Sequence, residues 1–326
     1  MEKLLTQLRA VAEPTRLRLL AICAQGELTV TELTQILGQS QPRVSRHLRL
    51  LCDSGLLDRF REGAWVFYRL AQDTGNAELG RVLMDLLPKD DPTLLLDLER
   101  LEQVKVARAE AAGAYFRENA PRWDEIRSLH VPESEVERVL LDIMDGLEIE
   151  DLLDIGTGTG RMLELFDPHV TKALGIDCSH EMLAVARSNL ERTGLRHSQV
   201  RHADMYQLPL PSEAFDAVTF HQVLHFADNP AGALLEAARV LRPGGILVVA
   251  DFAPHDLEDL RKNHAHRRLG FADGEVKKWF RAAGLEPEDV VHLPGDPLTV
   301  SVWWATRPAE NVQRGDHPKR LQKVAT

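Results

Sequence analysis

The stretch Asp151-Leu-Leu-Asp-Ile-Gly-Thr-Gly-Thr-Gly160 decides how the larger part of this chain folds. Its apolar run predicts a buried strand, and a helix-like segment opens directly after it at Arg161. Glycines at alternate positions between the two allow a sharp turn and let a ligand approach the backbone closely. The free amides at the start of the next helix favour a negatively charged ligand group. The stretch therefore predicts a strand, a glycine turn and a helix around a nucleotide-type ligand, although a glycine turn can also be purely structural.

The spacing of the glycines separates two classes of cofactor. The dinucleotide fingerprint is G-x-G-x-x-G, whereas this chain has Asp-x-Gly-x-Gly-x-Gly. This pattern resembles the first motif of the class I S-adenosylmethionine-dependent methyltransferases. Later stretches resemble that family's next motifs in the same order: Thr171–Asp177, Val200–Met205, Phe215–His225 and Leu241–Gly245. The resemblance implies an α/β Rossmann-like domain with a seven-stranded sheet and an antiparallel last strand.

The same resemblance implies S-adenosyl-L-methionine as the cofactor and assigns residues to it. Asp154 and the glycines would hold the methionine end, and Asp204 with Met205 would flank the adenine. Asp177 would take the ribose hydroxyls, since a carboxylate accepts from two donors at once. The expected cofactor-binding residues are Asp154, Gly156, Gly158, Gly160, Asp177, Cys178, Met182, Asp204, Met205 and His221. Simple packing is the alternative for Cys178 and Met182.

Two histidines are the candidate catalytic residues. The sulfonium already makes the methyl group electrophilic, so the protein has to align an acceptor and exclude water. His221 and His225 follow the fourth strand, at the sheet edge where ligands bind in open α/β folds. A histidine of near-neutral pKa can deprotonate a hydroxyl or amine acceptor, although a structural role is the alternative for each. The segment around Phe215–Phe226 is most similar to methyltransferases of the ubiquinone-biosynthesis type, which implies a small-molecule acceptor.

The first ninety residues have a different organisation. Apolar spacing and turn residues predict helices over 1–12, 15–24, 29–37 and 41–51, followed by a hairpin of strands over 56–61 and 64–70. A short helix, a glycine-containing turn, a second helix and a hairpin are typical of an α+β winged helix-turn-helix. The helix over 41–51 has no acidic residue, and its apolar positions Val44, Leu48 and Leu51 predict a single buried stripe.

Arginines and small hydroxyls at the front of such a helix suit base edges and phosphates in the major groove. A solvated charged face is the alternative, and the lack of acids favours double-stranded DNA as the partner. The hairpin arginines Arg59, Arg61 and Arg69 would contact phosphates. The expected DNA-binding residues are Ser40, Gln41, Arg43, Ser45, Arg46, Arg49 and Arg61.

This region resembles the ArsR/SmtB family of bacterial repressors through Ala12–Leu20, Gly26–Leu33 and Gln41–Leu51. The resemblance implies a homodimer that pairs the first helix with the last, here about residues 75–87, and an operator with two half-sites. Arsenic-sensing members have cysteines where this chain has Thr29 and Thr31, and hydroxyls are poor ligands for soft metals. We therefore expect no metal site.

Between these regions, residues 91–120 predict one long helix, either a dimerising coil or a spacer packed on a neighbour. The segment Ala114–Arg127, which overlaps the end of this helix, resembles a methyltransferase lid, with Tyr115, Phe116, Arg117 and Trp123 as candidates to close the site, and an interdomain contact is the alternative. We expect four parts: a DNA-binding domain over 1–90, a helical connector and lid over 91–130, a methyltransferase domain over 131–306 and a disordered tail over 307–326.

The composition limits the possible partners and the location of the protein. The net charge is −11, yet the first 90 residues hold 12 basic and 11 acidic side chains, so their basic clusters can still meet DNA. Neither a signal sequence nor an apolar run of membrane length is present, and the cytoplasm is the expected location. Two functions remain open: a transcriptional regulator with an active methyltransferase, or a non-catalytic sensor of S-adenosylmethionine or S-adenosylhomocysteine.

Overall fold

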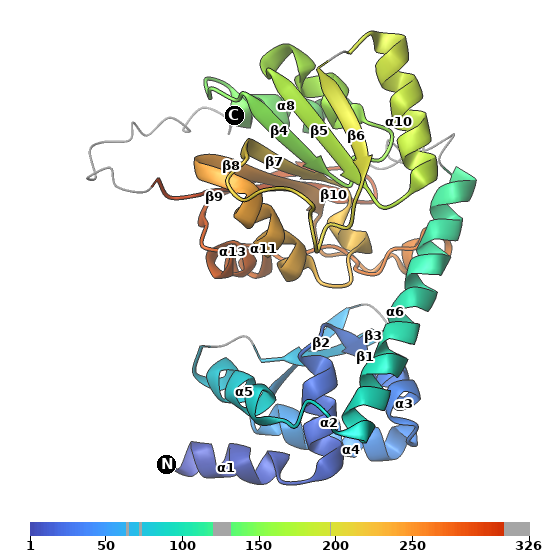
Figure 1. The fold of residues 1–326 in the computed structure, drawn as a ribbon, viewed down its shortest axis with the longest axis vertical. Helices are drawn as coiled ribbons and strands as arrows, with labels where there is room; N and C mark the ends of the chain where they lie inside the picture. The colour runs from blue at the N-terminus through green and yellow to red at the C-terminus, as the bar shows by residue number, and fades with distance from the viewer. Residues whose placement is uncertain (63–64, 72–73, 120–131, 196, 310–326) are drawn as a thin grey trace.

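The computed structural model describes residues 1–62, 65–71, 74–119, 132–195 and 197–309 of the chain (Figure 1). Two folded regions are joined by one long helix, which runs beside both of them in Figure 1. The predicted tail falls almost entirely outside the described residues, as do Trp123 and most of the expected lid.

The first region is a winged helix-turn-helix, as predicted. Its elements are α1 (Glu2–Val11), α2 (Pro14–Cys23), β1 (Leu28–Thr29), α3 (Val30–Leu37), α4 (Gln41–Asp53), β2 (Leu57–Glu62), β3 (Trp65–Leu70) and α5 (Thr74–Leu86). The sheet order is β1-β3-β2, with both pairings antiparallel. Strand β1 is an element that the sequence pattern did not predict, because two residues carry no periodicity.

Local sequence explains how the helix-turn-helix begins and packs. Thr29 caps α3 through a reciprocal pair of bonds: its Oγ1 accepts from the Glu32 amide, and the Thr29 amide donates to the Glu32 carboxylate at 2.7 Å. In α4, Val44, Leu48 and Leu51 are fully buried, which confirms the predicted stripe. This stripe orients the helix, so its remaining residues face outward.

Helix α6 (Pro92–Asn119) is anchored on the first region by its N-terminal half. Leu101 and Val104 are buried in the winged-helix core. The Arg18 guanidinium donates to both oxygens of Asp97 at 2.6 and 2.7 Å, and Arg100 donates to the Ile36 carbonyl near the end of α3 at 3.2 Å. This half of α6 is therefore a helix packed on its neighbour, which was one of the two alternatives.

The second region is a doubly wound α/β domain. Its strands are β4 (Asp151–Ile155), β5 (Lys172–Asp177), β6 (Ser198–His202), β7 (Phe215–His221), β8 (Leu241–Phe252), β9 (Glu286–Pro294) and β10 (Thr299–Thr306). Its helices are α8 (Glu133–Met144), α9 (Arg161–Phe166), α10 (His180–Thr193), α11 (Pro230–Val240), α12 (Glu258–Asn263) and α13 (Asp273–Ala282), with short 3₁₀ turns η2 (Asp167–His169) and η3 (Leu224–Phe226).

The seven strands follow the order β6-β5-β4-β7-β8-β10-β9. β10 is antiparallel to both of its neighbours, whereas the pairings from β6 to β8 are parallel, which confirms the predicted sheet. Alternate residues of β10 point to opposite faces, so Trp303 joins one apolar core and Trp304 the other. None of the described helices is long and apolar enough to cross a membrane.

The chain reverses its strand order between β4 and β7, and the carboxyl ends of these two strands lie side by side. Ligands of open α/β sheets bind at this switch point. The predicted glycine turn and both candidate catalytic histidines follow these strands.

Candidate methyltransferase site and DNA-binding face

The glycine turn after β4 adopts a backbone that other residues rarely reach. Gly156, Gly158 and Gly160 have φ angles of 73°, 53° and 86°. The Gly156 and Thr157 amides both donate to the Ile176 carbonyl at 2.8 Å, which folds the turn over the end of β5. A Cβ on Gly156 would lie 2.8 Å from Val223 Cβ, so the glycine also allows the segment after β7 to approach. The turn is therefore a fixed cradle of backbone amides.

Asp177 lies at the end of β5 and faces this cradle. One carboxylate oxygen accepts from the Gly158 amide at 2.9 Å, and the other accepts from the Ser179 amide at 2.8 Å. Burial raises the pKa of Asp177 above its ordinary value of 3.8, while these two amides act in the opposite direction. A carboxylate has about four acceptor positions. Each oxygen thus keeps acceptor capacity for a hydroxyl of a bound ribose.

The other residues expected around the cofactor occupy different environments. Met182 is buried, and its amide donates to Ser179 Oγ at 3.2 Å, whereas Cys178 is exposed. Desolvation of its thiolate form and the neighbouring Asp177 carboxylate raise the pKa of Cys178 to about 11, so it is a thiol at neutral pH. Asp204 is exposed after β6, and Met205 is partly buried. All four lie at the same carboxyl edge of the sheet.

Asp154 is buried within β4, and Thr219 Oγ1 on the adjacent strand β7 donates to it at 2.7 Å. It is held beneath the cradle.

The end of β7 brings both candidate catalytic histidines to the same edge. His221 is buried at the strand terminus, and Gln222 after it has a φ of 50°, a conformation that costs energy for a residue with a side chain. His225 is buried on η3, and its Nδ1 lies 2.7 Å from Asp251 Oδ1 at the end of β8. Because a carboxylate accepts, this contact favours a proton on Nδ1 and leaves Nε2 as the basic nitrogen. Asp251 also accepts from the amides of His225 and Phe252.

Aromatic residues surround this histidine. His266 stacks on His225 with 4.1 Å between ring centroids, and Phe226 lies at the same distance. Phe116 of α6 packs edge-on against Phe226 at 4.9 Å, so one predicted lid residue does reach the site. His266 and Asp251 are further residues of this site, and no sequence motif assigned them to it.

These residues fit S-adenosylmethionine. The turn has three positive-φ glycines, and Asp177 on the adjacent strand offers a carboxylate, as a ribose requires. Within the described ranges no group of three or more His, Cys, Asp or Glu side chains is placed to hold a metal ion.

Most of the DNA-binding candidates are exposed. On α4 and the turn before it, Ser40, Gln41, Arg43, Arg46 and Arg49 are exposed and Ser45 is partly exposed; Arg61 of β2 is exposed as well. Arg69 was expected to contact a DNA phosphate, but in the structure its side chain has other partners. Its guanidinium lies 2.7 Å from Glu27 and 3.1 Å from Glu275 of the α/β domain, so it is held in an ion-pair network. Periodicity placed Arg69 on a strand face but did not show what covers that face.

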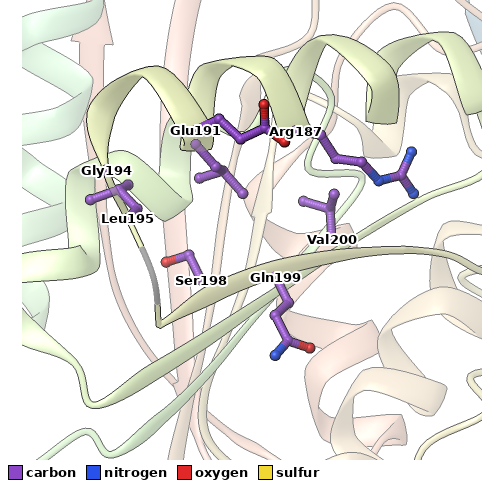
Figure 2. Close-up of a pocket in the computed structure, with 8 residues that line it drawn as sticks. Arg187, Glu191, Gly194, Leu195, Ser198, Gln199 and Val200 are labelled. Atoms are coloured by element: carbon purple, nitrogen blue, oxygen red, sulfur yellow. The ribbon is translucent and has the colours of Figure 1, made fainter.

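A shallow cavity of about 520 Å³ lies elsewhere, between α10 and the edge strand β6 (Figure 2). Arg187, Glu191 and Gln199 are among the residues that line it. None of the predicted site residues contributes to this cavity, so we do not assign the cofactor to it.

The fold and the site together define a class I, Rossmann-like methyltransferase joined to a winged helix-turn-helix. Family comparisons agree. The model of the methyltransferase domain matches residues 153–249, and the model of the bacterial regulatory proteins of the ArsR family matches residues 13–59.

Curated relatives extend this result. Ubiquinone biosynthesis O-methyltransferase of Dechloromonas aromatica is 30% identical over 56% of this chain and 86% of its own length. Demethylmenaquinone methyltransferase of Thermus thermophilus is 35% identical over 55% of this chain and 84% of its own length. An uncharacterized methyltransferase of Bacillus subtilis is 34% identical over 36% of this chain, and only 47% of its length is covered. A solved methyltransferase from Aquifex aeolicus is 23% identical, with a TM-score of 0.44, over 52% of this chain and 88% of that one.

The chain therefore belongs to the S-adenosylmethionine-dependent methyltransferases and carries an ArsR-family DNA-binding domain in front of the transferase domain. Its cofactor is S-adenosyl-L-methionine.

Proposed function

We propose that this protein is a DNA-binding regulator that also transfers a methyl group from S-adenosylmethionine to a small molecule. The observation that carries the proposal is the pairing of an intact cradle, with Asp177 bonded to the Gly158 amide, and a buried histidine–carboxylate pair at the adjacent strand ends. A protein that only sensed the cofactor would need the first feature and not the second. Two of the relatives are named ubiquinone biosynthesis O-methyltransferase and demethylmenaquinone methyltransferase, and the first name supports a small-molecule acceptor with a hydroxyl group.

In this proposal the residues have separate tasks. The glycine turn and Asp177 bind and orient the cofactor, and the bound cofactor supplies the electrophilic methyl group. Nε2 of His225 accepts the acceptor's proton, and Asp251 stabilises the imidazolium that results. His221, at the end of β7, is the second candidate base and borders the cofactor. Phe116 and Phe226 help to exclude water.

The DNA-binding part of the proposal uses the exposed arginines of α4 and Arg61 as contacts to an operator duplex. A homodimer through α1 and α5 is part of it. Leu4 and Leu5 on α1 are 44% and 43% exposed, and Leu86 on α5 is 74% exposed. Leucines exposed on both helices that the resemblance pairs are what a second copy would cover.

One experiment separates transfer from sensing. The full chain is incubated with methyl-tritiated S-adenosylmethionine and small-molecule fractions of a cell extract. Transfer of label to one fraction is expected, and no transfer to any fraction would leave the sensor function. His225→Asn keeps a group that can bond to Asp251 but removes the base, so turnover should fall about 10²-fold or more while cofactor affinity stays unchanged. His169→Ala, on the exposed turn η2, is the matched control.

A further inference from the structure

The wing of the DNA-binding domain has an aromatic face that lies outside the core of that domain. Phe60 on β2 stands opposite Phe67 on β3, and their rings stack at 5.5 Å between centroids. Trp65 lies 6.0 Å from Phe67. Phe67 is fully buried but does not belong to the winged-helix apolar core. Another part of the chain therefore covers this face.

Three arginines of the methyltransferase domain cover it. The Arg261 guanidinium lies 4.5 Å from the Trp65 ring centroid, Arg268 lies 5.1 Å from that of Phe60, and Arg267 lies 5.8 Å from that of Phe67. Cations are attracted to aromatic faces at these distances. We call Arg261, Arg267 and Arg268 the wing clamp.

A closed ring of charges fixes the clamp in place. Glu27 of the winged helix contacts Arg69 at 2.7 Å and Arg268 at 2.8 Å. Glu275 of α13 contacts the same two arginines, each at 3.1 Å. The two charges of each sign alternate, and Glu27 and Arg268 are buried. A buried network of this kind resists opening, because removal of one partner leaves a charge unpaired.

The clamp is also bonded to the loop that carries the catalytic candidate. The Arg267 and Arg268 amides donate to the His225 carbonyl at 2.9 and 3.0 Å. The Arg267 side chain has Nε 2.9 Å from Asp228 on the same loop, and its Nη2 donates to the Glu27 carbonyl at 2.6 Å. Arg267 thus touches the loop after β7 with one part of its guanidinium and the DNA-binding domain with another.

Two basic side chains of the wing lie on its opposite face. Arg59 and Arg61 alternate with Phe60 along β2, so they point away from the clamp, and both are exposed. The clamp therefore contacts the aromatic face of the wing, and the exposed Arg59 and Arg61 lie on the other face. A wing that is already held loses less freedom when it binds a duplex.

We infer that Arg267 couples occupancy of the methyltransferase site to DNA affinity, by holding the wing in a position set by the loop after β7. The inference rests on the proposed function. A ligand that moves His225 or Asp228 shifts Arg267, and with it Glu27 and the wing. By linkage, DNA must change the affinity for the cofactor product by the same factor.

The test uses the full chain, S-adenosylhomocysteine and a duplex that the native protein has selected from a random-sequence pool. DNA affinity is measured by fluorescence anisotropy with and without saturating S-adenosylhomocysteine. For the native chain we expect a change of about fivefold or more. For Arg267→Met, which keeps an apolar stem but removes both contacts, we expect weaker DNA binding and a change below about twofold. Trp65→Ala, at a partly exposed ring, should act in the same direction, and Arg281→Ala, exposed on α13, should behave like the native chain.

Calorimetric titration of S-adenosylhomocysteine into the native chain and each variant distinguishes failure of the coupling from failure of the proposed function. If the native chain binds both ligands but neither affects the other, the coupling is refuted while the proposed function stands. If Arg267→Met binds S-adenosylhomocysteine normally and keeps the native response, the route through Arg267 is refuted. If the native chain binds no duplex or no S-adenosylhomocysteine, the proposed function fails and the coupling with it.

Discussion

Replacement of Asp177 by asparagine should weaken the binding of S-adenosylmethionine by an amount that the local geometry sets. Each carboxylate oxygen accepts one backbone amide, from Gly158 or Ser179, and each can accept one more donor. Asparagine keeps the shape but has one acceptor oxygen and no charge, so at least one of the two charged hydrogen bonds to the ribose is lost, and its NH₂ group also faces one of the two backbone amides. A hydrogen bond to a charged group contributes about 1.5–3 kcal/mol, which corresponds to a roughly 10- to 150-fold higher Kd.

Isothermal titration calorimetry measures this Kd directly. Asp142→Asn is the matched control, because Asp142 is exposed on α8 and pairs with Arg138. It should bind the cofactor like the native chain. If Asp177→Asn retained the native Kd and a native melting temperature, the assignment of Asp177 to the ribose would be wrong.

Burial raises the pKa of Asp177 above its ordinary value of 3.8, and the ionised carboxylate is the form that accepts from the ribose. Acidification should therefore begin to weaken cofactor binding at a pH above 3.8. Calorimetry at decreasing pH that showed a loss of affinity only below pH 3.8 would contradict this. Gly156→Ala should reduce cofactor affinity and stability, since its φ is 73° and the new methyl group would press on Val223; a melting temperature and Kd equal to those of the native chain would refute the close approach. Reversal of charge at Arg43 and Arg46, to glutamate, should abolish duplex binding in a gel-shift assay with cofactor affinity retained, and unchanged DNA affinity would exclude α4 as the recognition helix.

Local patterns in the sequence were sufficient for much of the fold. Apolar spacing and turn residues predicted a helix over 29–37, close to α3 as found, and the spacing of Val44 and Leu48 predicted which side of α4 is buried. Both depend on neighbours within one or two helical turns. Strand β9 extends over Glu286–Pro294 through its pairing with β10, although most of its residues have no apolar alternation that would predict a strand.

Contacts between distant segments could not be predicted in the same way. The ion pair of Glu27 with Arg268 joins residues 241 positions apart, and neither residue has a local motif that indicates the other. Arg69 was expected at a phosphate for this reason, because nothing in the sequence near it indicates Glu27 or Glu275, its partners in the fold. The pair His225–Asp251 is an intermediate case. The strands that precede His225 and carry Asp251 were each recognised by their motifs, but only the order of the strands in the sheet brings His225 Nδ1 to 2.7 Å from Asp251 Oδ1.

The most direct measurement of the central claim is a calorimetric titration of S-adenosylmethionine into the native full chain while it is bound to a selected DNA duplex. We predict saturable binding of one cofactor per chain, with a Kd that differs from the value for the free protein because the two sites are coupled. The absence of any saturable heat, both with and without DNA, would contradict the claim that this chain joins a methyl-donor site to a DNA-binding domain.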